Sequence, residues 1–203
     1  MNELQEQWLD SVNTLDALLR SLSARSVDRD VEMDEALTLW VEKTIHIRRE
    51  RRTVFLIGNG ASASMASHVA ADLAKNAHVH TEVFSDLSLI TAIANDMSYE
   101  EVFAEPLRRR MEHGDMLVAI SSSGQSPNVV RAVREARNLG GYVVTLSAMH
   151  EENALRGLGH LNFYVRAETY GMAETCHTSI LHYWIDRMVN FVNGTEDRKQ
   201  GNE

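Results

Sequence analysis

The stretch from Gly114 to Arg131, GDMLVAISSSGQSPNVVR, decides the fold of this chain. Met116 to Ile120 form a short apolar run after a Gly-Asp turn, which predicts a buried strand. Serines and a glycine follow, and Ser126-Pro127 is typical of a helix start, with serine at the N-cap and proline at the first helical position. Apolar residues then recur at helical spacing as far as Gly140-Gly141. The stretch therefore predicts a strand, a hydroxyl-rich loop and a helix in succession.

This serine loop is a candidate anion site. The N-terminus of the following helix supplies free backbone N–H groups and the positive end of the helix dipole, and the serine hydroxyls add neutral donors. Phosphate is the ligand that this arrangement favours, and an ordinary polar loop is the alternative. The Gly-Lys-Ser/Thr signature of nucleotide-hydrolysing loops is missing, which disfavours nucleotide hydrolysis. The donors would be Ser121, Ser122, Ser123 and Ser126.

Composition narrows the class of protein. The chain has 203 residues, a hydrophobic fraction of 44% and a charged fraction of 24%, which fit one α/β domain, or a domain with a helical appendage. A formal net charge of −9 argues against a nucleic-acid-binding surface. The single cysteine, Cys176, excludes an internal disulfide and fits a reducing compartment. With no signal-peptide pattern and no membrane-spanning apolar run, we expect a cytoplasmic protein.

Outward from the serine loop, strands alternate with helices, which predicts a parallel, doubly wound sheet. The expected strands are residues 53–57, 79–84, 116–120, 142–146 and 161–165, and the expected helices between and after them are residues 62–76, 87–94, 100–111, 127–139, 152–158 and 171–192. Two helices, over residues 2–24 and 31–49, precede the first strand. Their apolar stripes must pack over the sheet or against another subunit, which favours a homo-oligomer over a monomer with folded-back helices.

A second loop and one ionisable cluster complete the sequence-based site. Gly58-Asn59-Gly60 follows the first strand and lets the backbone approach a ligand, although the full dinucleotide-binding pattern is absent. His68 and Asp72 are four residues apart on one helix, which suits a shared metal ion, an acid/base pair or a surface pair. Glu174 and His182 share a face of the last helix. If the two helices meet, two imidazoles and two carboxylates would form a set of zinc ligands.

These motifs, in this order and spacing, resemble the sugar isomerase (SIS) domain family, and within it the phosphoheptose isomerase group. The matching segments are Gly58 to Ser62, His68 to Asp72, Ala94-Asn95-Asp96 and Ile120 to Ser126. The resemblance covers residues 50 to 192 and extends to the two N-terminal helices. It implies three parts, namely a helical hairpin over residues 1–50 used in oligomerisation, a SIS domain over 51–193 and a polar tail over 194–203.

The resemblance also implies a flavodoxin-like parallel sheet, a homotetramer with active sites between subunits, and roles for single residues. Ser121, Ser122, Ser123 and Ser126 would hold the sugar phosphate, and Asn59, Ser62 and Asp96 would bind the sugar hydroxyls. The zinc ligands would be His68, Asp72, Glu174 and His182, with Asp72 and His182 as the acid/base pair. The family's usual glutamate is the shorter Asp72 here, its usual glutamine is Glu174, its usual aspartate three positions earlier is Gly171, and a glycine of the second loop is Ala61.

Two functions are therefore expected, and they belong to different classes. The first is a phosphosugar aldose–ketose isomerase that converts sedoheptulose 7-phosphate, or a related ketose phosphate, through an enediol. This reaction needs a base, an acid and a group that stabilises the oxyanion. The second is a non-catalytic SIS protein that binds a phosphosugar or a protein partner as a regulator. Retention of His68 and His182 favours the enzyme, whereas Asp72 and Gly171 favour the regulator.

Overall fold

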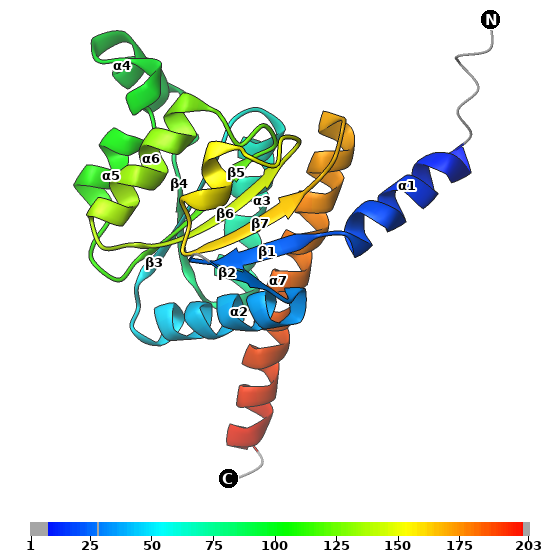
Figure 1. The fold of residues 1–203 in the computed structure, drawn as a ribbon. Helices are drawn as coiled ribbons and strands as arrows, with labels where there is room; N and C mark the ends of the chain where they lie inside the picture. Colours follow the sequence, from blue (N-terminus) through cyan, green and yellow to red (C-terminus); the bar gives the residue numbers. More distant parts are fainter. Residues whose placement is uncertain (1–7, 28, 201–203) are drawn as a thin grey trace, which may run out of the picture.

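The computed structural model describes residues 8–27 and 29–200, which form a three-layer α/β fold around one sheet (Figure 1). The seven strands of the described chain lie in the order β2-β1-β7-β6-β5-β3-β4. The five strands from β7 to β4 are parallel, whereas β1 is antiparallel to both β2 and β7. The strands are β1 (Ser23–Ser26), β2 (Arg29–Val31), β3 (Thr53–Gly58), β4 (His80–Val83), β5 (Met116–Ser121), β6 (Tyr142–Ala148) and β7 (Leu161–Val165).

Helices cover both faces of the sheet. One face packs against α2 (Met33–Arg49), α3 (Ala61–Ala77) and α7 (Tyr170–Gln200). The other face packs against the shorter elements, which are α4 (Leu87–Asp96), the 3-10 helix η1 (Tyr99–Glu101), α5 (Ala104–Arg110), α6 (Pro127–Asn138) and the 3-10 helix η2 (Ala154–Gly157). The expected fold class, a largely parallel sheet flanked by helices, is confirmed. Every helix within residues 8–27 and 29–200 is too short or too polar to cross a membrane.

The central strand β5 shows how the sequence builds these layers. All six of its residues are buried, so the apolar run faces protein on both sides. Because side chains alternate along a strand, Val118 and Ile120 enter the core beneath α3 and α7, and Leu117 and Ala119 enter the core beneath α6. The first core is closed by Trp40 of α2, whose ring stacks on Trp184 of α7 at a centroid distance of 4.0 Å. These contacts fix α7 against the sheet.

The N-terminal part differs from the sequence-based prediction. The helix expected over residues 2–24 is α1 (Trp8–Arg20), and its residues 2–7 lie outside the described chain. Strands β1 and β2 follow it as a hairpin that was not predicted, and β1 pairs with the edge of β7, which makes the sheet mixed rather than purely parallel. Ser-Ala-Arg-Ser has little strand propensity of its own, so the open edge of β7 determines its conformation. Helix α1 has no buried residue and projects from the body of the fold (Figure 1).

Two other boundaries differ. Helix α7 extends to Gln200 rather than ending near residue 192, so most of the expected tail is helical, and residues 201–203 lie outside the described chain. The single helix expected over residues 100–111 is divided into η1 and α5. Pro106 lies in the first turn of α5, where a missing N–H costs little.

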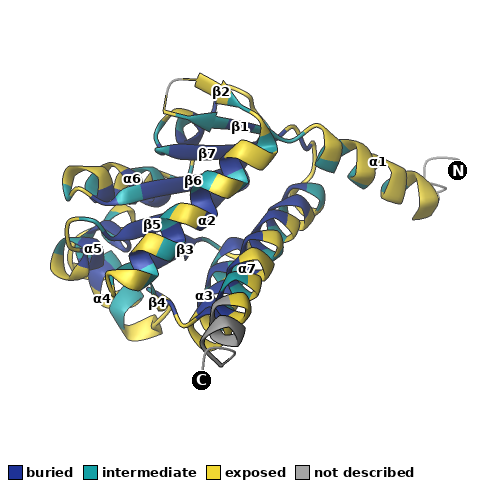
Figure 2. Cartoon of the chain, turned by 90° about the horizontal axis from the view of Figure 1, so that it is seen from below, coloured by how far each residue is buried: buried dark blue, intermediate teal, exposed yellow. Residues whose placement is uncertain are grey.

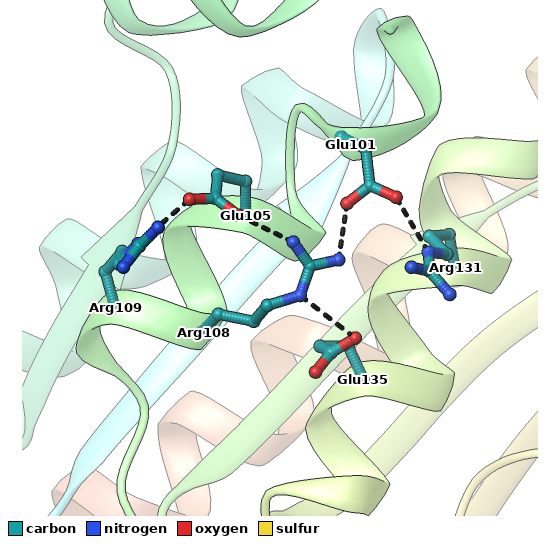
Figure 3. Close-up of polar contacts among 6 residues, drawn as sticks. All are labelled: Glu101, Glu105, Arg108, Arg109, Arg131 and Glu135. Carbon is teal, nitrogen blue, oxygen red and sulfur yellow. Dashed lines mark hydrogen bonds and ion pairs between the residues drawn. The ribbon is translucent and has the colours of Figure 1, made fainter. Parts of the chain in front are cut away.

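An ionic network, hereafter the Arg108 network, holds η1, α5 and α6 together (Figure 3). The Arg108 guanidinium donates to Glu101 at 2.5 Å and to Glu105 at 2.6 Å, and it lies 3.3 Å from Glu135. Arg131 of α6 donates to the second oxygen of Glu101 at 2.9 Å. Burial acts to raise the pKa of Glu101, but hydrogen bonds from the two arginines outweigh it and the pKa lies below its ordinary value. Arg108 is therefore the centre of this network, with an ion pair to each of three carboxylates.

Candidate active site

The serine loop lies where the sequence predicted it, between the end of β5 and the start of α6. Ser121 ends the strand, and its hydroxyl lies 3.1 Å from that of Ser126 and 3.5 Å from that of Ser123. Ser126 occupies the N-cap position, but its side chain makes no capping hydrogen bond to the helix and contacts Ser121 instead. Three hydroxyls therefore gather in front of the first turn of α6, as an anion site requires.

Gly124 gives the loop its shape. Its φ is +63°, and a Cβ at this position would collide with the side chain of Asn153. Its N–H donates to the carbonyl of Ser121 at 3.0 Å, and its own carbonyl accepts from the N–H of Leu155 at 3.1 Å. A glycine is required because the turn needs a positive φ and the loop is pressed against η2.

Ser122 differs from its neighbours. Its hydroxyl is buried and has no hydrogen-bond partner among the described residues, while its carbonyl accepts from the N–H of Ala148 at 3.0 Å. The hydroxyls of Ser121, Ser123 and Ser126 are thus brought together, and that of Ser122 is not in contact with them. The chain turns directly after Ser121, as the hydrogen bond from the Gly124 N–H to the Ser121 carbonyl shows, and this turn separates the Ser122 side chain from those of its neighbours.

The second loop, Gly58-Asn59-Gly60, is joined to the serine loop by a pair of amides. The Asn59 Nδ2 donates to Asn128 Oδ1 at 2.9 Å, and the Asn128 Nδ2 donates back to Asn59 Oδ1 at 2.9 Å. The Tyr99 hydroxyl also donates to Asn59 Oδ1, at 3.2 Å. Sequence reasoning missed Asn128 and Tyr99, although Asn128 lies inside the stretch that predicted the serine loop.

The other residues expected on the sugar lie near this loop to different degrees. Ser62 is buried in the first turn of α3, and its N–H donates to the Asn59 carbonyl at 3.0 Å. Asp96 ends α4, is exposed, and accepts from the side-chain amide of Asn95 at 2.9 Å. Ser62 is therefore hydrogen-bonded to the loop. Asp96 lies three residues before Tyr99, whose hydroxyl donates to Asn59 of the loop.

The predicted ionisable cluster forms where α3 and α7 lie side by side (Figure 2). One ligand atom from each of His68, Asp72 and His182 lies within 4.8 Å of the others. His68 Nε2 is 3.4 Å from Asp72 Oδ2, and the two imidazole rings are 5.4 Å apart between centroids. The His68 side chain is 58% exposed and that of Asp72 29%, so a ligand has access to both. The i, i+4 spacing brings His68 next to Asp72 on α3, and the small residues of that helix allow α7, which carries His182, to pack closely against it.

Glu174 is not part of this cluster within the described chain. It precedes His182 on α7 by two helical turns, which correspond to about 12 Å along the helix axis. Its contact in this region is between its backbone carbonyl and the Thr178 hydroxyl, at 2.8 Å. One chain therefore brings together three of the four residues that we expected to bind zinc.

Two neighbours on α7 are buried. Cys176 is fully buried in a small cluster with Ala148 and Val165, and burial raises the pKa of its thiol. His177 is 1% exposed, and neither ring nitrogen has a hydrogen-bond partner among the described residues. Burial lowers its pKa to about 4, so its ring is neutral at physiological pH.

The serine loop and the ionisable cluster are separated along α3. From Ser62, beside the loops, to His68 is six residues, or about 9 Å of helix rise. A ligand that used both places would be an extended molecule with an anionic end and a reactive end.

Comparisons with known proteins identify the family to which the chain belongs. A family model described as SIS domain matches residues 17–148. The phosphoheptose isomerase of Helicobacter pylori strain P12 is 30% identical over 162 residues, which cover 75% of this chain and 84% of that protein. The phosphoheptose isomerase of Shewanella sp. strain W3-18-1 is 28% identical over 182 residues, covering 85% and 91%. A phosphoheptose isomerase structure from Francisella tularensis superposes with a TM-score of 0.76 at 21% identity, covering 90% and 98%.

Proposed function

Because the chain belongs to the SIS domain family, we propose that it is a phosphosugar aldose–ketose isomerase acting on sedoheptulose 7-phosphate or a related ketose phosphate. One observation carries the proposal. Helix α3 begins beside the serine loop, with its gathered hydroxyls, and carries, farther along, two members of a cluster of two imidazoles and a carboxylate. Phosphate anchoring and proton transfer are the two tasks that such an enzyme performs, and the names of the curated relatives agree with both.

The phosphate would be held by the hydroxyls of Ser121, Ser123 and Ser126 at the N-terminus of α6. The chain of the sugar would then extend along α3 toward Asp72 and His182. The Asp72 carboxylate removes a proton from C1 of the ketose, and His182 gives a proton to the C2 carbonyl oxygen, which forms the enediol. Removal of the C1 hydroxyl proton and donation of a proton from the Asp72 carboxyl to C2, after that carboxyl has exchanged its proton with solvent, give the aldose.

The cluster also fits a divalent metal such as zinc. His68, Asp72 and His182 offer two imidazole nitrogens and a carboxylate oxygen, a donor set that leaves one position of a tetrahedral site open. A bound metal would polarise the sugar carbonyl and so make the neighbouring C–H more acidic. A ring nitrogen or carboxylate oxygen that held the metal could not carry a proton at the same time, so Asp72 and His182 carry protons in the metal-free cluster.

We propose further that the protein functions as a homo-oligomer, in the tetrameric form that the resemblance implies. Support comes from α1, whose residues Trp8 and Leu9 are 78% and 64% exposed. Large apolar side chains on a helix that projects from its own domain favour burial against another copy. Light scattering of the purified protein tests this, and a monomer at micromolar concentration would contradict it.

The function is tested by incubating the purified protein with sedoheptulose 7-phosphate and following the sugar by NMR, before and after removal and return of zinc. We expect the anomeric signal of an aldose product, with Asp72→Asn as the matched inactive control. Tight binding of the sugar phosphate without turnover would favour the non-catalytic regulator instead.

A further inference from the structure

The amide pair formed by Asn59 and Asn128 joins the two loops of the candidate site. Each side chain donates to the other at 2.9 Å, so the two amides form a closed, reciprocal pair. Asn128 is 2% exposed, whereas Asn59 is half-buried and lies nearer the ligand side. A reciprocal pair of this kind can be assembled in two ways, because turning both amides over exchanges every oxygen with a nitrogen and keeps both hydrogen bonds.

The backbone of α6 decides between these two arrangements. The N–H of Val129 lies 3.0 Å from Asn128 Oδ1 and, being a backbone donor, needs an acceptor there. Asn128 must therefore point its oxygen toward Val129, which turns its NH2 group toward Asn59. It follows that Asn59 presents its oxygen to that NH2 group. The polarity of both amides is thus set by one N–H in the first turn of the helix.

Tyr99 also helps to fix the orientation of the Asn59 amide. Its hydroxyl is the second donor to Asn59 Oδ1, at 3.2 Å, so both lone pairs of that oxygen are occupied. One N–H of the Asn59 amide goes to Asn128, and the other has no partner in the pair. Asn59 therefore has a donor to offer and no acceptor.

The position of Tyr99 is itself fixed. Tyr99 begins η1, and Glu101 at the end of this short helix is bound by Arg108 of α5 and Arg131 of α6 (Figure 3). The Tyr99 side chain is otherwise in contact with solvent, since the residue is 56% exposed. The Arg108 network thus keeps an exposed tyrosine in place above the Gly-Asn-Gly loop.

We propose that Asn128 and Tyr99 are positioning residues, which lock the Asn59 amide so that it presents one N–H, and no free acceptor, to the sugar portion of the ligand. The ligand must then offer an oxygen lone pair at this point, from a carbonyl, a hydroxyl or a ring oxygen. This inference rests on the proposed function, in which Asn59 contacts the sugar. Both residues would act through Asn59 rather than through the phosphate-binding hydroxyls.

The test is a set of double-mutant cycles with two readouts, the KM for sedoheptulose 7-phosphate and the Kd for inorganic phosphate. We expect Asn128→Ala to raise KM about tenfold and Tyr99→Phe about threefold, the range for loss of a positioned hydrogen bond. The Kd for phosphate should change less than about twofold. In an Asn59→Ala background neither substitution should raise KM further, because the residue through which they act is gone. Asn138→Ala, an exposed asparagine at the other end of α6, is the matched control and should change nothing.

Two results would overturn the proposal. One is additivity of Asn128→Ala or Tyr99→Phe with Asn59→Ala, which would show that they act independently of Asn59. The other is a loss of phosphate affinity that parallels the rise in KM, the result of a general structural role. Turnover by the unsubstituted protein is measured first, and its absence would count against the proposed function alone.

A second measurement needs no enzyme activity, and it can be made on the unsubstituted protein as well as on the variants. In an 15N-labelled protein, the side-chain amide signals of Asn59 are identified by their loss in Asn59→Ala. We expect one of its two protons to exchange slowly in the unsubstituted protein and in Asn138→Ala, and both to exchange fast in Asn128→Ala. Fast exchange of both protons in the unsubstituted protein would overturn the proposal.

Discussion

The serine loop and the His68–Asp72–His182 cluster are built in opposite ways. The three hydroxyls that gather in the loop come from residues 121 to 126, a single turn of chain between a strand and a helix. The cluster joins residues 68 and 72 of α3 to residue 182 of α7, more than a hundred positions away. Local backbone conformation creates the first site, whereas the packing of two helices on one face of the sheet creates the second.

The two sites therefore depend on different parts of the fold. The loop is shaped by Gly124, by the end of β5 and by the start of α6, and η1 and α5 support it through the Arg108 network. The cluster needs α3 and α7 to keep their spacing. The position of α7 is maintained by its contacts with α2, which are the buried Trp40–Trp184 stack and the hydrogen bond from Trp184 Nε1 to Thr44 Oγ1 at 3.0 Å. Changes in the core should therefore affect catalysis before they affect phosphate binding.

The largest effect is expected from Asp72→Asn, which separates the chemistry of the cluster from binding at the loop. Loss of the general base should reduce kcat by about 10³-fold, while the Kd for inorganic phosphate stays unchanged. Asp72→Glu restores a carboxylate and should retain measurable turnover. Steady-state kinetics with calorimetry checks this, and equal losses of turnover and phosphate affinity would show that the two sites are not separable.

The next largest effect is expected on the free energy of unfolding, through His177, which is buried on α7. Burial lowers the pKa of His177 to about 4, against 6.5 for an ordinary histidine, a difference that corresponds to about 3 kcal/mol. Because the unfolded chain takes up the proton first, the free energy of unfolding should be highest above pH 6.5 and decrease from there to about pH 4.

We expect His177→Gln to remove most of the change in the free energy of unfolding between pH 6.5 and 5, leaving a smaller part that comes from His160, whose pKa burial also lowers. This range lies above the window in which Glu101 and Glu105, whose pKa values are lowered by their arginine partners, become protonated. Urea unfolding across the range measures the difference. An unchanged pH dependence in the variant would mean that another group is responsible.

A smaller effect is expected on the loop side from Arg108→Met. Removing the guanidinium leaves three partly buried carboxylates without their shared partner, which should lower the free energy of unfolding by about 2 kcal/mol. Arg109→Met is the control, since the Arg109 side chain is 76% exposed and its single ion pair contributes little. Urea unfolding at neutral pH compares the two variants. Equal effects would show that the Arg108 network stabilises the fold no more than an exposed ion pair does.

The smallest effect is expected from Ser123→Ala. The Ser123 hydroxyl lies beside that of Ser121 and accepts from the N–H of Gln125 at 3.3 Å. Its loss should weaken phosphate binding about tenfold, the range for one hydrogen bond to a charged group, and leave His68, Asp72 and His182 in place. Calorimetric titration with phosphate measures this, and Ser179→Ala on the exposed face of α7 is the control. Unchanged phosphate affinity in Ser123→Ala would contradict the assignment of the serine loop.

The same contrast explains what the sequence could predict. The strand, the serine loop and the start of α6 follow from an apolar run, a proline and a glycine, and these are local signals. The i, i+4 spacing predicted the closeness of His68 and Asp72, and the meeting with His182 followed only on the assumption that two helices pack. The exclusion of Glu174 from the cluster follows from its spacing, because residues that share a helical face but are eight positions apart lie about 12 Å apart along the axis.

Two features of the structure could not be predicted from the sequence. Strand β1 adopts its conformation because the edge of β7 is available to it, and Ser-Ala-Arg-Ser reads as a polar connection in isolation. The amide pair of Asn59 and Asn128 joins residues 69 positions apart through ordinary side chains. Such contacts are set by the tertiary fold and become visible only there.

The most direct test of the central claim is solvent exchange during turnover of sedoheptulose 7-phosphate in D2O. If Asp72 and His182 carry protons while the serine loop holds the phosphate, deuterium should enter C2 of the aldose product, and Asp72→Asn should show no incorporation while still binding the substrate. Product without deuterium at C2, or incorporation that persists in Asp72→Asn, would contradict the account.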